Sequence, residues 1–313
     1  MREPSSRQKL GRRTFLKASV LPAALAIPGG PAGHPAEGAG QPPGEPAAGP
    51  ELIDSNVHLF RWPFRPLKYD RTEELVRQLR RHRIGRAWAG SFEAVLHKQL
   101  DLANRRLADE CRERGDGLLI PFGSVNPAWP DWEEDLRRCH EQYKMPGVRL
   151  FPAYHGYGLD HPELLRLLDN AAGRGLVVQI AIRLEDERVH LPCVVAPAVS
   201  ASPLPEVLVK VPRARVQLLN ADTVFRSRDV WALVERTRTA FDIAAVEGNG
   251  GISRLIEGGH PNYRGQVPVE RLLFGTHAPL FPCEGALLKL FESPLDRRQL
   301  DRIMHANARS LLG

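Results

Sequence analysis

Hydrophobic residues recur in short, nearly continuous runs from residue 51 onward. Runs of this kind predict buried strands of a parallel sheet, because both faces of such a sheet are covered. Eight of them lie at residues 52–60, 86–92, 118–125, 147–151, 176–182, 215–221, 241–247 and 271–277. Between the runs, helical spacing of apolar residues predicts helices. The clearest lie at residues 72–81, 97–114, 132–143, 162–174 and 228–239.

Strands that alternate with helices along a chain form parallel sheets. Eight strand–helix units in about 260 residues match the size of a closed eightfold barrel. We therefore predict an α/β fold made of one eightfold (β/α) barrel of the TIM type, in a single domain. A doubly wound open sheet is the alternative. It would usually carry a glycine-rich phosphate loop after its first strand, and this sequence has none there.

The first fifty residues differ in composition from the rest. Arg12 and Arg13, followed by Thr-Phe-Leu-Lys, precede a short apolar stretch at 18–27, which is the order of a twin-arginine export signal. Residues 29–50 are rich in Pro, Gly and Ala and predict a linker. We expect a signal at 1–28, a barrel at 51–313, and export to the periplasm or the cell exterior. The alternative is a chance arginine pair before an apolar tail.

The formal net charge of +6 includes the basic residues of the signal. Elsewhere basic and acidic residues are interleaved, as at 133–138 and 296–301, which is typical of solvated helix faces and does not favour a nucleic-acid partner. Signal apart, no apolar segment reaches transmembrane length. The cysteines match no zinc or redox spacing, and an exported protein permits disulfides whose pairing the sequence leaves open. They are Cys111, Cys139, Cys193 and Cys283.

Polar residues at predicted strand ends are the candidates for chemistry. Asn56 and His58 are two residues apart on the first strand, so their side chains share a face near the carboxyl mouth of a barrel. His277 ends the last strand, which neighbours the first when a barrel closes. Glu247 ends the predicted seventh strand beside it. We expect His58, His277 and Glu247 to form a metal site or a metal-free acid/base group. Hydrogen bonding inside packed loops is the alternative.

Other polar or aromatic residues near the predicted mouth are candidates for substrate contacts. Arg183 is suited to clamp an anion and Glu185 to act as acid, base or ligand, although surface ion pairs explain this charged run equally well. Arg149, inside the fourth strand, needs a carboxylate or ligand partner if it points inward. Aromatic residues there suit a lid or ordinary packing. The full set is Trp62, Arg149, Tyr154, His155, Arg183 and Glu185.

Several motifs together resemble the amidohydrolase superfamily, in its amidohydrolase-related group of metal-dependent hydrolases and decarboxylases. They are Ile-Asp-x-x-x-His at 53–58, Ser-Val-Asn-Pro at 124–127, Gly-Val-Arg-Leu-Phe-Pro at 147–152, Val-Val-Gln-Ile at 177–180, Leu-Phe-Gly-Thr-His-Ala-Pro at 273–279 and Asn-Ala-Arg at 307–309. The resemblance covers most of residues 51–313. It implies an eightfold α/β barrel with a divalent metal, often zinc, at the carboxyl face. The usual ligands are His-x-His on the first strand, one His on each of the fifth and sixth, and an Asp on the eighth.

This chain departs from that ligand pattern at four positions. Asn56 replaces the first histidine, and Ala181-Ile182 follows where the fifth strand should supply one. Asn220 lies near the sixth-strand position, and His277 takes the place of the aspartate. Only His58 is unchanged, and asparagine is a poor zinc ligand. We expect either a rebuilt site for zinc or manganese, or no metal.

The resemblance and its departures lead to two hypotheses. The first is an enzyme that hydrolyses or decarboxylates a small anionic substrate through a rebuilt carboxyl-face site. Its catalytic candidates are His58, His277, Glu247, Asn56 and Asn220. The second is a catalytically inactive barrel that binds a ligand or partner. A homo-oligomer is compatible with both.

Overall fold

The computed structural model describes residues 51–191, 194, 196–259 and 265–313. The predicted export signal, the linker and Cys193 lie outside the described residues, so export remains a prediction. Cys111, Cys139 and Cys283 are buried free thiols. Within the described ranges, no helix is long and apolar enough to cross a bilayer.

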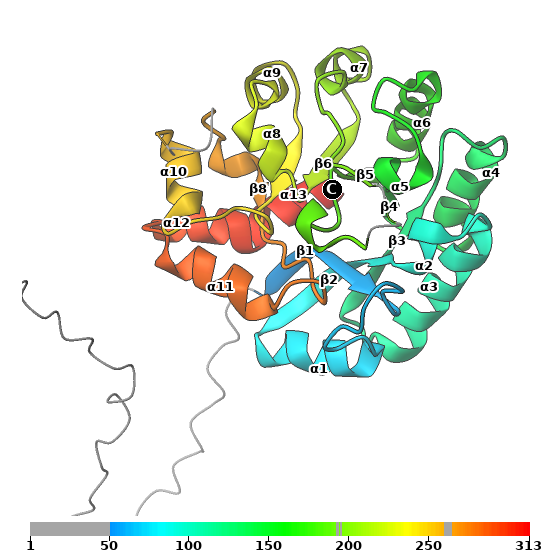
Figure 1. Cartoon of the computed structure of the whole chain (residues 1–313), viewed down its shortest axis with the longest axis horizontal. Helices are drawn as coiled ribbons and strands as arrows, with labels where there is room; N and C mark the ends of the chain where they lie inside the picture. Colours follow the sequence, from blue (N-terminus) through cyan, green and yellow to red (C-terminus); the bar gives the residue numbers. More distant parts are fainter. Residues whose placement is uncertain (1–50, 192–193, 195, 260–264) are drawn as a thin grey trace, which may run out of the picture. The chain divides into compact units, whose positions relative to one another are not determined.

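Eight parallel strands follow one another around the sheet in sequence order, each paired with the next (Figure 1). This confirms the predicted eightfold (β/α) barrel. The strands are β1 (Leu52–Leu59), β2 (Ile84–Ser91), β3 (Leu119–Ser124), β4 (Gly147–Leu150), β5 (Val177–Ala181), β6 (Arg215–Leu219), β7 (Ala240–Asp242) and β8 (Leu272–Leu273).

Helices connect the strands and surround them (Figure 1). The α-helices are α1 (Thr72–Arg81), α2 (Glu93–Leu96), α3 (Leu100–Arg114), α4 (Trp132–Arg137), α5 (Pro152–His155), α6 (Pro162–Gly173), α7 (Leu204–Lys210), α8 (Asp222–Arg226), α9 (Asp229–Arg236), α10 (Gly251–Glu257), α11 (Cys283–Glu292), α12 (Arg297–Asp301) and α13 (Asn307–Leu312). Short 3-10 or π segments lie at η1 (Arg138–Gln142), η2 (Glu187–Val189), η3 (Val269–Arg271) and η4 (Arg302–Ala306).

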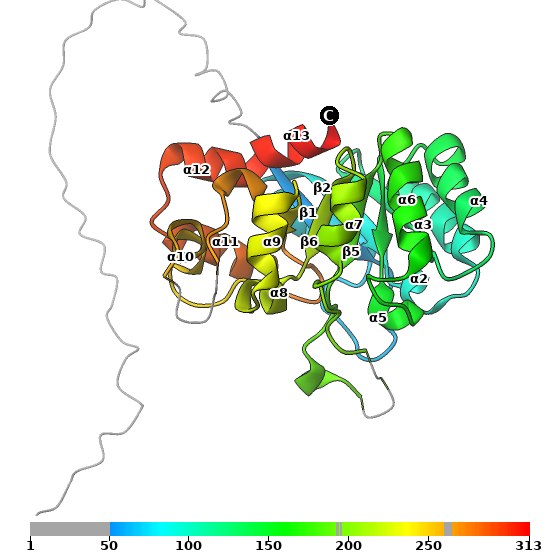
Figure 2. The ribbon, with the colours of Figure 1, turned by 90° about the horizontal axis from the view of Figure 1, so that it is seen from above.

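Seen from the side, α12 and α13 lie at the end of the barrel where the strands begin, whereas α5, α8 and the loop with η2 lie at the opposite, carboxyl end (Figure 2). At the amino end, the Arg215 guanidinium donates to the carbonyls of Leu311 and Leu312, which ties α13 to the start of β6. The carboxyl end is therefore the end that the C-terminal helices leave uncovered.

The first and last strands meet at a seam, as predicted. Ser55 N donates to Phe274 O at 2.9 Å, and His277 N donates to Asn56 O at 2.8 Å. Beyond β8, the Thr276 hydroxyl donates to Asp54 Oδ2 at 2.6 Å, and Thr276 N donates to Asp54 Oδ1 at 3.0 Å. Side-chain bonds thus supplement a short ladder and close the barrel.

The predicted limits of the last two strands were wrong. β7 ends at Asp242 rather than Glu247, because Val246 N bonds back to Ile243 O in a turn. β8 ends at Leu273, because Phe274 N donates to Ile303 O of the C-terminal segment and leaves the ladder. Burial alone does not separate a strand from a buried turn, which is why both predicted runs were too long.

Candidate active site at the carboxyl end

A layer of polar side chains fills the barrel toward the carboxyl ends of the strands. Every member is at most 2% exposed, and most are fully buried. The strand register places three of them side by side on β4, β5 and β6. We call this set the polar layer, and its members are Asn56, His58, Arg149, Gln179, Gln217, Asn220, Asp242 and His277.

Arg149 is the cation of the polar layer. Its Nε donates to Gln179 Oε1 at 2.9 Å, its Nη1 to Val57 O at 2.9 Å, and its Nη2 to Trp88 O at 3.1 Å. Nη1 also lies 3.0 Å from His58 Nε2. Burial lowers the pKa of Arg149 to about 9, so the guanidinium stays charged at neutral pH. All of these acceptors are neutral, which leaves the charge without a directly bonded carboxylate.

His58 is an uncharged acceptor for this cation. Burial, and secondarily the Arg149 charge, lower its pKa well below the usual range. Because Nε2 accepts from Arg149, the proton of the neutral ring belongs on Nδ1. The ring stacks on Phe92 with centroids 4.8 Å apart and planes 7° apart. The orientation of the His58 ring is therefore determined by the Arg149 guanidinium at Nε2 and by the Phe92 ring stacked on one face.

His277 lies beside His58, as the sequence predicted, with ring centroids 5.1 Å apart. Its Nε2 lies 2.6 Å from Leu184 O and donates to it, so Nδ1 is the acceptor nitrogen and faces Asn220 Nδ2 at 3.3 Å. Burial lowers the pKa of His277 to about 3. Both histidines are thus neutral at physiological pH.

Asp242 joins the two asparagines of the layer. Asn56 Nδ2 donates to Asp242 Oδ2 at 2.6 Å and to Asn220 Oδ1 at 3.1 Å, while Asn220 N donates to Asp242 Oδ1 at 3.0 Å. Burial raises the pKa of Asp242 to about 6 and that of Asp54, at the seam, to about 7. Both carboxyl groups therefore hold a proton more readily than an exposed aspartate does.

Sequence reasoning missed Asp242 because the predicted strand continued to Glu247. A signal existed: Asp242 is the one charged residue in the apolar run 240–246. Glu247 lies instead in the following loop, where its side chain is 63% exposed and pairs with Arg226 at 3.0 Å. The structure therefore brings His58 and His277 together without Glu247.

Aromatic residues cover the polar layer near β1. Trp62 is 3% exposed and packs on Phe92, with ring centroids 5.0 Å apart. Glu185 holds it there, since Glu185 Oε2 accepts from Trp62 Nε1 at 3.0 Å and Oε1 accepts from Arg65 Nη2 at 2.6 Å. Tyr154 packs against Trp62 with ring centroids 6.0 Å apart. Glu185 thus anchors the loop that carries Trp62.

His155 and Arg183 are the two remaining residues predicted to contact the substrate. His155 is partly buried, and its Nε2 donates to Ala94 O at 2.9 Å. Arg183 is 17% exposed and forms an ion pair from Nε to Asp222 at 2.8 Å. It lines a cavity of about 240 Å³ together with Lys289, a residue that no sequence motif singled out.

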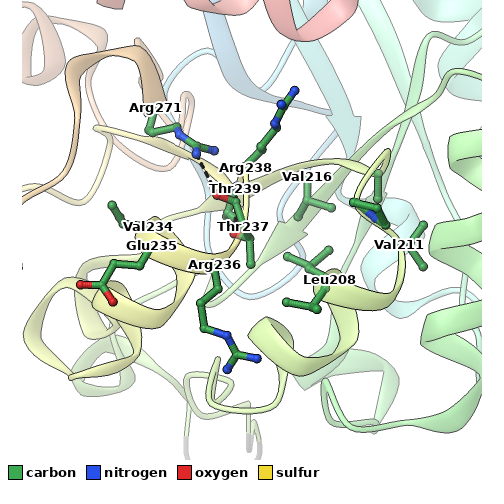
Figure 3. A pocket seen from close by; sticks show the side chains of 13 residues that line it. Leu208, Val211, Val216, Val234, Glu235, Arg236, Thr237, Arg238, Thr239 and Arg271 are labelled. Atoms are coloured by element: carbon green, nitrogen blue, oxygen red, sulfur yellow. Dashed lines mark hydrogen bonds between the residues drawn. The ribbon is translucent and has the colours of Figure 1, made fainter.

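A larger cavity, of about 460 Å³, lies at the other end of the barrel (Figure 3). Its lining residues lie before or at the starts of β6, β7 and β8, and include Arg236, Arg238 and Arg271. The Arg271 guanidinium donates to Thr237 O at 2.7 Å, as drawn in Figure 3. In α/β barrels, residues at the amino-terminal end contribute to stability rather than catalysis, so we place the candidate site at the carboxyl end.

A polar layer at the carboxyl ends of eight parallel strands defines the class: a (β/α) barrel of the kind that carries enzyme active sites at this end. The amidohydrolase family model matches residues 53–242, more than half of the chain. The chain therefore belongs to the amidohydrolase family.

Solved structures with the same fold include several decarboxylases. One, 2,6-dihydroxybenzoate decarboxylase with bound 2,6-dihydroxybenzoate, has a TM-score of 0.63 at 15% identity and covers 84% of this chain and 99% of that chain. Another, 5-carboxyvanillate decarboxylase from Sphingomonas paucimobilis, has a TM-score of 0.64 at 13% identity over 84% and 98%. A dihydroxybenzoic acid decarboxylase from Polaromonas sp., with manganese and the inhibitor 2-nitroresorcinol, has a TM-score of 0.63 at 13% identity over 84% and 96%. Comparison with curated proteins finds no match.

The side chains at the centre of this barrel do not fit the divalent metal expected from the superfamily resemblance. His58, the one unchanged ligand position, presents Nε2 to the Arg149 guanidinium, and a cation at 3.0 Å opposes a second cation at that nitrogen. His277 uses its Nε2 to donate to a carbonyl. Within the described ranges, no group of three or more His, Cys, Asp or Glu side chains is placed to hold a metal. The predicted set with Glu247 is not assembled.

Proposed function

We propose that this protein hydrolyses or decarboxylates a small organic anion at the carboxyl end of its barrel, without a metal at the family's position. The observation that carries the proposal is Arg149, a buried guanidinium whose hydrogen-bond acceptors are all neutral. A fixed cation in a low-dielectric interior attracts an anion and stabilises negative charge that develops on it.

Both reaction classes develop negative charge at a new atom: in decarboxylation the charge of the carboxylate moves to carbon as neutral carbon dioxide leaves, and in hydrolysis an oxyanion forms when water adds and gives up a proton. Arg149 would stabilise that charge through space, while Asp242, whose pKa is about 6, would exchange the proton. His277 would orient Asn220 rather than transfer protons, because burial lowers its pKa to about 3 and makes the ring a weak base. The decarboxylase neighbours support a carboxylic acid as the substrate class, without specifying one.

The test uses Arg149→Met and Arg149→Lys. A panel of hydroxybenzoates and small esters or lactones is assayed for release of carbon dioxide or acid, after chelator treatment. We expect turnover by the wild type, at least about a hundredfold loss in Arg149→Met, and partial retention in Arg149→Lys, which keeps the charge. Circular dichroism checks that each variant is folded. Equal turnover by wild type and a folded Arg149→Met would refute the role of the cation.

Ligand binding without turnover is the second candidate function. The two histidines favour this function. Each has its Nε2 occupied by a bond within the protein, so that nitrogen is not available to act on a substrate. Calorimetry with the same panel separates the candidates. Saturable binding with no product over a day would favour a binding protein, whereas product formation would exclude it.

A further inference from the structure

We propose that the anionic group of the ligand binds off the barrel axis, in the cavity beside α11, between Arg183 and Lys289. This inference rests on the proposed function for its ligand class and adds the place, the contacts and the size of the ligand. We call the space the Lys289 cavity. It is lined by Arg183, Ala244, Ala245, Glu247, Thr276, Phe281, Pro282, Gly285, Ala286 and Lys289.

The Lys289 cavity adjoins the polar layer. Its wall includes Thr276, the residue before His277 in the chain, and Phe281, whose ring meets the His277 ring edge-on with centroids 5.0 Å apart. Arg183 connects to the layer through its carbonyl, which accepts from Asn220 Nδ2 at 2.9 Å. The wall of the cavity is therefore connected to His277 and Asn220 of the polar layer.

Lys289 is positioned to bind an anion. It reaches from α11 to the turn after β7, where its Nζ donates to Ile243 O at 3.2 Å and Ala244 O at 2.5 Å. An ammonium group has three N–H donors, so these bonds leave one for a ligand. Burial lowers the pKa of Lys289 to about 8, which leaves the amine mainly charged at pH 7. Arg183 is also on the wall, with its Nε paired to Asp222, so the cavity is lined by two cationic side chains.

Small residues leave space in the wall of the cavity. A Cβ added to Gly285 would meet no atom within 4 Å, and Ala244, Ala245 and Ala286 are also part of the lining. The volume of about 240 Å³ equals the liquid volume of about eight water molecules. Phe281 offers an aromatic surface in this space. The cavity thus fits a compact acid of about the size of one aromatic ring.

Glu247 favours a single negative charge on that acid. It lies on the cavity wall, with its side chain 63% exposed and paired with Arg226. A second carboxylate on the ligand would approach this like charge. The ligand class is therefore a monocarboxylate with a small planar body.

The experiment titrates benzoate into the full chain by calorimetry. Gly285→Leu fills the cavity with an apolar side chain, and Lys289→Gln removes its charge. We expect each to weaken benzoate binding by at least about tenfold. Gly173→Leu is the matched steric control, because Gly173 also has open space around an added Cβ and ends α6, outside the cavity. Arg238→Gln is the charge control at the amino-end cavity. Both controls should bind like the wild type.

Three results would overturn the inference: no benzoate binding by the wild type at millimolar concentration, unchanged binding by a folded Gly285→Leu, or an equal loss in Arg238→Gln. Thermal unfolding confirms that each variant is folded.

Failure of the proposed function gives a different pattern of results. If the Lys289 cavity binds benzoate but no compound of the panel is turned over, this site stands and the enzymatic proposal fails. If Arg149→Met abolishes turnover while Gly285→Leu changes nothing, the reverse holds.

Discussion

Two residues of the polar layer occupy an unusual backbone conformation. Asn220 has φ 53° and His277 has φ 60°, both in the left-handed region, which is uncommon for residues other than glycine although asparagine and histidine adopt it more often than most. In each case the side chain bonds within the buried network: Asn220 Oδ1 accepts from Asn56 Nδ2, and His277 Nε2 donates to Leu184 O. Such conformations persist where surrounding bonds determine them, and they concentrate at functional sites. The positions of these two side chains are therefore part of the fold.

The buried ring of His277 makes stability depend on pH. Its folded pKa of about 3 lies below the 6.5 of an ordinary histidine. The stability that depends on the neutral ring is fully present above pH 6.5 and is lost as the pH falls toward 3. His277→Asn removes this titration and suits the left-handed backbone.

We expect the difference in unfolding free energy between wild type and His277→Asn to shrink between about pH 6.5 and pH 4, by at most about 1.4 kcal/mol per pH unit. Urea unfolding at several pH values measures it. His97→Asn, at an exposed position, is the control. A difference independent of pH would show that His277 can be charged in the folded protein.

For single residues, the sequence could predict which side chains lie near one another only where those residues are at strand ends. Asn56, His58, Asn220 and His277 could be placed together because the order of parallel strands determines which ends are neighbours. Lys289 could not, since it belongs to α11 and reaches the turn after β7 through tertiary packing alone. The partners of Arg149 are likewise contributed by three other strands.

Among the elements, the loops after β1 and β5 meet across the barrel mouth. Trp62 and Arg65 belong to the first and Glu185 to the second, and a single carboxylate bonds to both donors. The sequence offered two interpretations of this charged run, a surface cluster or a functional group. The structure adds a third interpretation. Glu185 is 5% exposed and holds Trp62 in place through a hydrogen bond, and Trp62 packs on Phe92, which in turn stacks on His58.

Glu185→Gln tests this anchor. A neutral amide bonds less strongly to the Arg65 guanidinium, so the loop at residues 60–67 should open more often. We expect faster hydrogen–deuterium exchange at residues 60–67, with little change in α3 or α6. Glu133→Gln, which removes an exposed ion pair with Arg166, is the control. Unchanged exchange in Glu185→Gln would mean that aromatic packing alone holds the loop.

For the whole molecule, the barrel was predictable because the strand–helix alternation is local and repeats eight times. The hydrogen bonds within the polar layer were not, because they join strands far apart in the sequence. One consequence concerns metals: the positive charge at the centre of the polar layer belongs to the Arg149 guanidinium.

We therefore expect chelators, zinc and manganese to leave the Tm unchanged, because only a ligand that binds the folded state raises it. Thermal unfolding of the full chain, with metal content measured by mass spectrometry, is the test. One bound equivalent together with a concentration-dependent rise in Tm would contradict the expectation. Arg149→Met, measured in parallel, shows whether removal of the guanidinium allows zinc or manganese to bind.

The seam between β1 and the residues after β8 also has a consequence for the order of folding. The Ser55 hydroxyl donates to Phe274 O, across 219 positions of the chain. While the chain is being synthesised, β1 can pair with β2, but its other edge has no partner until residue 274 has emerged. Contacts of such long range slow folding, and an open strand edge invites pairing with other chains. The step most exposed to aggregation is therefore the last one, when the ends of the barrel sequence find each other.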